Sequence, residues 1–168
     1  MGELDKVLGG LIELSRALRN VSHWLHPPAL RYLGLGAALK SLQETFENTH
    51  GIRIQVVVPP VVPRLPDELE LCIFRISQGC LQNIAKHSRA DKVRIVLELT
   101  INEIRLRVSD TGRGFDPSKA MQEGGLGLLS MKERALSLGG RFSVKSSPGS
   151  GTEIRVTLPI QDDRAVKV

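Results

Sequence analysis

The chain has 168 residues, which is the usual size of one domain, or of one small domain with an appended element. Hydrophobic residues make up 41% and charged residues 24%, with a mean hydropathy of −0.06, so the composition fits a folded globular chain and argues against disorder. No apolar run approaches the roughly 18 residues of a membrane span, and the N-terminus lacks the basic-then-apolar order of a secretory signal. The net charge of +5 suits an anionic partner without naming one.

The first 50 residues predict helices. Apolar residues spaced alternately by three and four form a heptad seam, Pro27 and Pro28 interrupt it, and a second apolar stripe follows. The two helices either pack on their own domain or form part of a dimerisation bundle, and we favour the bundle because a lone hairpin this apolar needs a partner. The seam comprises Leu4, Val7, Leu11, Leu14, Leu18, Val21 and Leu25, and the second stripe comprises Leu35, Leu39, Leu42 and Phe46.

Residues 51–160 alternate between strand and helix patterns, in the order strand, helix, two strands, helix and two strands. Because the strand pairs read as hairpins rather than βαβ crossovers, we predict an α+β two-layer sandwich and not a Rossmann fold. Asp67 is placed to cap the first helix, and the polar tail 161–168 is expected to be flexible. The expected strands lie within 52–56, 93–99, 104–108, 142–144 and 154–158, and the helices within 67–87 and 128–138.

A first glycine-rich stretch follows the third expected strand. Asp110 ends this strand, and Gly112 and Gly114 come two and four residues later. A carboxylate at a strand end accepts a hydrogen bond from an exocyclic amine, and the glycines let the backbone pass close to a flat ligand. An ordinary Asp-Gly turn contains the same residues, so this motif alone is not specific.

A second glycine-rich stretch, Gly124-Gly125-Leu126-Gly127, opens the next helix. The free amides and the dipole of a helix N-terminus favour an anion, and glycine permits a phosphate to approach closely. No Gly-Lys-Ser/Thr sequence follows, which excludes a Walker A loop. A flexible loop that closes onto a helix is the alternative interpretation.

Polar residues also end the long helix that precedes these stretches. Asn83 and Lys86 are predicted to share one helix face with Gly79, with His87 beside it. The amide oxygen of Asn83 suits Mg²⁺, and Lys86 would approach a phosphate. Taken singly, Asn83 also fits a solvated helix surface and His87 a C-terminal helix cap.

The order and spacing of these motifs resemble the ATP-binding domain of sensor histidine kinases, whose Bergerat fold is shared with gyrase, mismatch-repair and heat-shock chaperone ATPases. This resemblance covers residues 51–160, including Gly-Ser-Gly-Thr at the entry to the last strand. Residues 83–90 are similar to the N box of the nitrate-sensor and desaturase-sensor subfamily. Residues 21–39 are similar to the second helix of that subfamily's dimerisation domain, so residues 1–50 would be a partial dimerisation and phosphotransfer segment.

The resemblance implies which residues bind the nucleotide. Asp110 would bind the adenine amine, and Thr152 would support the adenine pocket through its hydroxyl. Asn83 would hold Mg²⁺ against the triphosphate, and residues 111–125 would form a lid that orders on binding. The complete set of implied binding residues is Asn83, Lys86, His87, Asp110, Gly112, Gly114, Gly125, Leu126, Gly127 and Thr152.

The phosphate-accepting histidine is expected to lie outside this chain. In the subfamily it belongs to a His-Asp motif on the preceding helix, and no His-Asp occurs here. His23 stands in a segment similar to the histidine box of other sensor kinases, but too little chain separates it from Asn83 for the remaining bundle helices and the entry strand.

Gly79 occupies the position where the family's N box usually carries a glutamate, four residues before the asparagine. That glutamate is thought to act as a base or to orient the attacking group, and glycine can do neither. Loss of a catalytic base commonly removes about 10²–10⁴-fold in rate. We therefore expect ATP binding to persist and phosphoryl transfer to be weak.

Together these features predict the ATP-binding catalytic part of a sensor histidine kinase, with ATP and Mg²⁺ as cofactors. The γ-phosphate would pass to the external histidine and then to an aspartate of a response-regulator protein, and the full-length protein would be a homodimer through its helical segment. The alternative is a degenerate nucleotide-binding or dimerisation module, which Gly79 favours. Basic residues scattered among acids, without an aromatic platform, argue against nucleic acid. Two cysteines without metal or disulfide spacing favour a cytoplasmic location, with no membrane contact by this segment.

Overall fold

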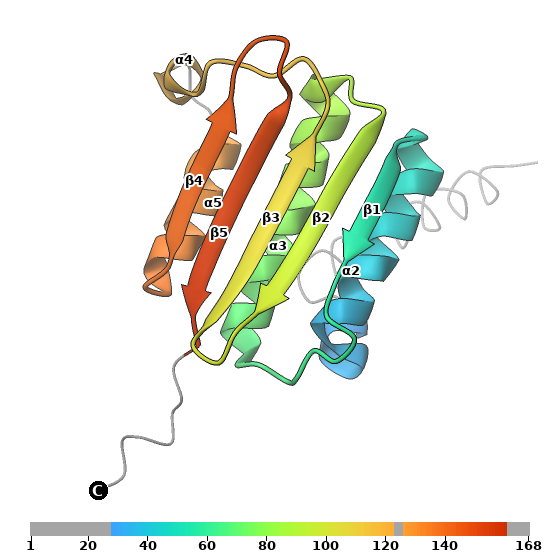
Figure 1. Cartoon of the computed structure of the whole chain (residues 1–168), viewed down its shortest axis with the longest axis vertical. Helices are drawn as coiled ribbons and strands as arrows, with labels where there is room; N and C mark the ends of the chain where they lie inside the picture. Colours follow the sequence, from blue (N-terminus) through green and yellow to red (C-terminus); the bar gives the residue numbers. More distant parts are fainter. Residues whose placement is uncertain (1–27, 123–125, 161–168) are drawn as a thin grey trace, which may run out of the picture.

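The computed structural model describes residues 28–122 and 126–160, so the heptad seam and the tail predicted for 161–168 lie outside the described residues. In the described part, one five-stranded sheet is covered on one face by helices, as Figure 1 shows. None of the described helices is long and apolar enough to cross a membrane. The elements in chain order are α2 (Pro28–His50), β1 (Arg53–Val57), α3 (Asp67–Asn83), the π-helix η1 (Ile84–Ser88), β2 (Lys92–Leu99), β3 (Glu103–Asp110), α4 (Pro117–Gln122), α5 (Leu126–Ser137), β4 (Arg141–Ser146) and β5 (Thr152–Pro159).

The strand order across the sheet is β1-β2-β3-β5-β4. Strands β2 and β3 form one hairpin, β4 and β5 form another, and β3 pairs with β5 antiparallel. The α+β two-layer prediction is confirmed. One detail is wrong: β1 runs parallel to β2, so β1, α3 and β2 form a βαβ crossover rather than a hairpin.

The two faces of the sheet differ in polarity. Along β3 the residues Ile104, Leu106 and Val108 are buried under the helices, whereas Arg105 and Arg107 point to the open face. Exposed ion pairs of this kind contribute only about 0–1 kcal/mol each, so the covered face supplies the stability. The pairs on and beside the open face include Arg105–Glu103 at 2.7 Å, Arg107–Glu98 at 3.6 Å and Arg155–Glu153 at 2.7 Å.

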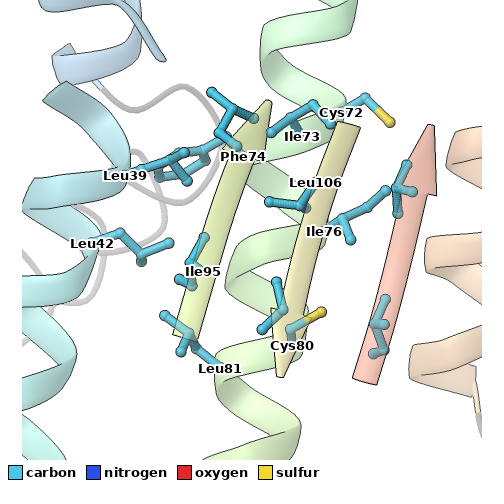
Figure 2. Close-up of a cluster of buried hydrophobic side chains, with 14 of the residues drawn as sticks. Leu39, Leu42, Cys72, Ile73, Phe74, Ile76, Cys80, Leu81, Ile95 and Leu106 are labelled. Carbon is cyan, nitrogen blue, oxygen red and sulfur yellow. The ribbon is translucent and has the colours of Figure 1, made fainter. Parts of the chain in front are cut away.

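Helix α3 lies across the centre of the covered face, and its predicted apolar stripe is buried (Figure 2). The stripe follows the helical period, which places its residues on one side of the helix. The prediction that Asp67 caps this helix is wrong: the helix begins at Asp67 itself, Pro66 takes the cap position, and no side chain caps it. The buried stripe comprises Leu69, Ile73, Ile76, Cys80 and Ile84.

Helix α2 packs into the same core as the sheet domain. Its four predicted apolar residues are buried, and Leu39 and Leu42 lie in one cluster with Phe74 of α3 and Ile95 of β2 (Figure 2). Residues on either side of position 50 therefore share one core in the described structure.

A kink divides α2 at Gly34, whose φ of 80° lies in the region that favours glycine. The carbonyl groups of Leu30 and Arg31 just before the kink accept hydrogen bonds from the Arg64 guanidinium at 3.2 and 2.7 Å. The buried Glu70 carboxylate lies 3.8 Å from Arg64 and accepts the Leu65 amide hydrogen at 3.1 Å. The segment before α3 thus ties the first turn of α2 to the domain.

Candidate nucleotide-binding site

A cavity of about 580 Å³ opens where the end of α3, the end of β3 and the start of α5 meet. Its volume lies within the usual range for small-molecule sites, and its walls are mostly apolar with a few polar groups, as such sites require. The predicted residues that line it are Asn83, His87, Asp110, Gly114, Leu126, Gly127 and Thr152.

Asp110 is the last residue of β3, so its side chain stands at the end of the sheet, where the cavity begins. Its Oδ1 atom accepts two hydrogen bonds, from the Ser88 hydroxyl at 2.6 Å and from the Gly112 amide at 2.8 Å. Within the described residues, Oδ2 accepts none. The carboxylate is therefore fixed on one side and available as an acceptor on the other.

Asn83, the last residue of α3, meets the first turn of α5. A Cβ atom built on Gly127 would lie 3.4 Å from the Asn83 Oδ1 atom, so the amide group and the backbone of that turn are close neighbours. The first turn of α5 presents free backbone N–H groups and the positive end of the helix dipole. Asn83 and this turn together form a polar end of the cavity that suits phosphate.

Lys86 is not among the residues that line this cavity, so the structure does not bring it together with Asn83 there. Residues Ile84–Ser88 form a π-helix, whose wider turn keeps His87 at the cavity and turns Lys86 away from it. Lys86 instead lines a separate polar hollow with Arg53 of β1 and Arg89.

Gly79 also lies outside the cavity lining and faces α5. A Cβ atom at this position would come within 2.7 Å of the Met131 Cε atom, so the Met131 side chain fills the space above the glycine. The Met131 sulfur lies 3.8 Å from the Cys80 sulfur in the same contact. The position is thus a packing contact between α3 and α5 in this chain.

Three glycines allow close backbone approaches around Asp110. A Cβ atom on Gly112 would overlap Ser88, one on Gly114 would overlap the Ser147 carbonyl, and one on Gly151 would overlap the Asp110 carbonyl. Gly114 and Gly151 also have φ values of 60° and 70°. The loops that follow β3 and precede β5 can therefore touch only because these positions lack side chains.

We expect Gly151→Ala to lower the free energy of unfolding by about 3 kcal/mol or more, since the new methyl group meets backbone atoms that cannot move aside. Gly149→Ala is the matched control, because Gly149 has a similar φ of 82° but open space around it. The control carries only the left-handed strain of about 1–2 kcal/mol. Urea unfolding of both variants measures the difference, and equal losses would contradict the close approach.

Thr152 belongs to a small hydroxyl network at the start of β5. The Ser146 hydroxyl donates to the Gly151 carbonyl at 2.9 Å and accepts the Phe115 amide hydrogen, also at 2.9 Å. Ser146 and Thr152 hydroxyl oxygens lie 3.1 Å apart. Because Ser146 has only one hydrogen, Thr152 is the donor in this pair, and its lone pairs remain available toward the cavity.

Ser88 and Ser146 are the site residues that the sequence did not point to. Each acts through a hydrogen bond to a predicted element, Ser88 to Asp110 and Ser146 to the loop at Phe115. In the sequence, Ser88 lies within residues 83–90, which resemble the N box, but no local pattern marks Ser146.

The predicted lid, residues 111–125, is only partly described. Gly125 lies outside the described residues, and Leu126 begins α5 at the cavity with 75% of its surface exposed. A short helix, α4, lies within the predicted lid, where the sequence analysis expected no element. It stands at the end of the sheet beside the turn between β4 and β5 (Figure 1).

Both cysteines are free, buried and protonated at neutral pH. Burial raises the pKa of the Cys80 thiol, which lines the cavity, to about 12, and burial raises the pKa of the Cys72 thiol to about 11. A thiolate is needed for nucleophilic attack or metal binding. Cys80 therefore contributes an apolar wall to the cavity rather than a reactive group.

The donor set of the cavity fits a cation carried by a nucleotide. Among the described residues, no group of three or more His, Cys, Asp or Glu side chains converges to form a metal cage. Mg²⁺ usually keeps several water ligands and binds through substrate phosphates and one or two protein oxygens. The single amide oxygen of Asn83 meets that requirement.

Curated relatives of known kind match most of this chain. It is 34% identical over 143 residues to the signal transduction histidine-protein kinase/phosphatase DegS of Brevibacillus brevis, covering 85% of this chain and 37% of that protein. It is also 34% identical over 157 residues to the oxygen sensor histidine kinase NreB of Staphylococcus carnosus, covering 94% of this chain and 45% of that protein. The chain thus spans less than half the length of these relatives.

Solved structures share the fold. The histidine kinase domain of the blue-light-activated histidine kinase of Erythrobacter litoralis superposes with a TM-score of 0.63 at 25% identity, covering 75% of this chain and 61% of that one. The histidine kinase AdeS of Acinetobacter baumannii superposes with a TM-score of 0.60 at 15% identity, covering 96% and 87%, which shows the common fold.

Residues 68–162 match the family described as histidine kinase-, DNA gyrase B-, and HSP90-like ATPase. This range contains α3, the π-helix, both glycine-rich stretches and the cavity. The resemblance to sensor histidine kinases that the motifs indicated is confirmed, and the chain belongs to this ATPase family.

Proposed function

We propose that this chain is the ATP-binding catalytic part of a sensor histidine kinase, which transfers the γ-phosphate of ATP to a histidine outside the chain. The main support is a single cavity in which the Asp110 carboxylate stands at one place and Asn83, with the first turn of α5, at another. An acceptor for an amine and a phosphate-binding end within one apolar cavity match the two ends of ATP.

The proposed roles follow from the chemistry of each group. Asp110 accepts a hydrogen bond from the adenine amine, and the Thr152 hydroxyl accepts one near the base. The α5 amides beside Gly127 bind phosphate. Asn83 holds Mg²⁺, which would neutralise charge on the triphosphate when bound. The chain would thus contribute mainly positioning and charge compensation to phosphoryl transfer.

The wider assignment is also a proposal. Residues 1–50 would belong to the dimerisation and phosphotransfer region of a longer homodimeric protein, and residues 51–160 would be the catalytic domain. The phosphoryl group would pass from histidine to an aspartate of a response regulator. We place this catalytic domain in the cytoplasm. The names of the curated relatives, a signal transduction histidine-protein kinase/phosphatase and an oxygen sensor histidine kinase, support the signalling role.

A calorimetric titration with ATP tests the binding function, with and without Mg²⁺. We expect binding in the micromolar-to-millimolar range, tighter when Mg²⁺ is present because Asn83 then gains a ligand. Limited proteolysis of the segment 116–124 in the same samples reports lid ordering, as slower cleavage with ATP. A folded protein with no measurable ATP affinity would contradict the proposal.

A second candidate is a degenerate module that binds nucleotide, or partners alone, without phosphoryl transfer. The observation in its favour is Gly79, whose place above α3 is filled by Met131 rather than by an acid. Incubating the longer protein that contains the acceptor histidine with γ-labelled ATP separates the two candidates. ATP binding without any labelled histidine would favour the degenerate module.

A further inference from the structure

Ser88 occupies a constrained position between the π-helix and the loop that follows β3. It is the last residue of η1, it is 8% exposed, and the next residue, Arg89, has a left-handed φ of 56°. Its carbonyl oxygen accepts the Arg113 amide hydrogen at 2.8 Å. The backbone on both sides therefore fixes where the Ser88 hydroxyl lies.

The Ser88 hydroxyl is a donor to Asp110. The distance from Oγ to Oδ1 is 2.6 Å, which is typical of a strong O–H···O⁻ hydrogen bond. The Gly112 amide hydrogen bonds to the same oxygen at 2.8 Å. Two donors on Oδ1 hold the plane of the carboxylate, because rotation about its last side-chain bond would break both contacts.

This arrangement has a consequence for the other oxygen. With Oδ1 engaged by two donors, Oδ2 is the oxygen left to face a ligand, and it can only accept. The ligand group that it matches is a donor in a fixed direction, such as an exocyclic amine. A carboxylate without the Ser88 contact would keep only the Gly112 amide and would sample other orientations.

We propose that Ser88 is a positioning residue that makes Asp110 selective for a 6-amino purine. This inference rests on the proposed ATP-binding function and deepens it. Ser88 does not touch the nucleotide; it acts by holding the Asp110 carboxylate in the orientation that accepts from the amino group. The Asp110 carboxylate is the charged acceptor, and the Ser88 hydroxyl fixes the orientation of that carboxylate.

The test compares ATP with inosine triphosphate, which lacks the 6-amino group, by calorimetry on the full chain. We expect Ser88→Ala to weaken ATP binding by about tenfold, the usual effect of losing one hydrogen bond to a charged group. Inosine triphosphate should lose less than about twofold, because it presents no amine to Oδ2. The preference for ATP over inosine triphosphate, measured as the ratio of their affinities, is therefore smaller in Ser88→Ala than in the original chain.

Ser88→Cys is the second variant, because a thiol is a weak donor but, unlike the alanine methyl group, does not leave the space beside Asp110 empty. It should behave as the alanine variant does while keeping the packing against Gly112. Equal weakening of both nucleotides, or ATP affinity within twofold of the original in both variants, would overturn the proposal. A parent chain that binds ATP supports the ATP-binding part of the proposed function whatever the variants do, and one that binds neither nucleotide overturns both proposals.

Discussion

Replacing Asp110 with asparagine is expected to lower the affinity for ATP by about 100-fold or more while the fold persists. Ser88 and Gly112 both donate to Oδ1, so the amide oxygen of the new side chain must take that place. Its NH₂ group then takes the place of Oδ2 and faces the adenine amine, donor against donor. A site built around one hydrogen bond discriminates strongly when its polar partner is mismatched.

Asp116→Asn is the matched control for this variant. Asp116 is another loop carboxylate, and its Oδ1 accepts the Ser118 amide hydrogen at 2.9 Å, which an asparagine oxygen can also do. Titration calorimetry measures both affinities, and thermal unfolding confirms that both variants are folded. An Asp110→Asn variant that binds ATP within threefold of the original chain would show that the adenine lies elsewhere.

Patterns of period two and period 3.6 made the covered face of the sheet predictable. The α3 stripe and the β2–β3 hairpin follow from side-chain spacing alone, because burial on one face demands that spacing. The parallel pairing of β1 with β2 is different, since strand direction depends on how the chain crosses the sheet and not on the pattern within either strand.

The site was less predictable because backbone geometry decides it. Nothing in the residues Ile84–Ser88 distinguishes a π-helix from a continued α-helix, yet this turn moves Lys86 away from Asn83 and brings Ser88 to Asp110. The close approaches at Gly114 and Gly151 have the same character. The sequence shows the glycines, and only the tertiary contact shows which backbone atoms each one meets.

The packing partner of the apolar helix face within residues 1–50 could not be predicted from the sequence. An apolar helix face predicts a packing partner but does not say which one. In the described structure the partner of α2 is the sheet domain, through Leu39 and Leu42, and Arg64 holds its first turn. The buried face of α2 would be available to a dimer partner only if α2 left the sheet domain.

The net charge of +5 does not correspond to a uniformly basic open face of the sheet. Arginines on the open face of the sheet stand beside glutamates, so that face presents mixed rather than uniform charge.

Gly79→Glu is expected to raise the rate of autophosphorylation by about 10–100-fold in the longer protein that contains the acceptor histidine. The family's usual glutamate would then stand one helical turn before Asn83, where it can orient the attacking group. The atom nearest to the new Cβ is Met131 Cε at 2.7 Å, which is the far end of a flexible side chain. Met131 can therefore rotate aside, and the fold should tolerate the change.

Gly79→Ala separates the effect of the new carboxylate on the rate from the effect of the added side-chain volume. Alanine displaces Met131 in the same way and improves helix propensity by about 1 kcal/mol, but it supplies no base. We expect it to leave autophosphorylation unchanged, and both variants to keep the ATP affinity of the parent because position 79 does not line the cavity. Initial rates with γ-labelled ATP at saturating concentration give the comparison.

The double variant Gly79→Glu with Met131→Ala tests whether the Met131 side chain keeps the new carboxylate from turning toward Asn83. Removing the methionine side chain opens the space beside position 79 and lets the carboxylate turn toward Asn83. A rate gain in the double variant alone would mean that Met131 had blocked the acid. If neither variant raises the autophosphorylation rate, the missing glutamate is not what limits phosphoryl transfer by this chain. The degenerate-module hypothesis would then need support from another difference between this chain and its family.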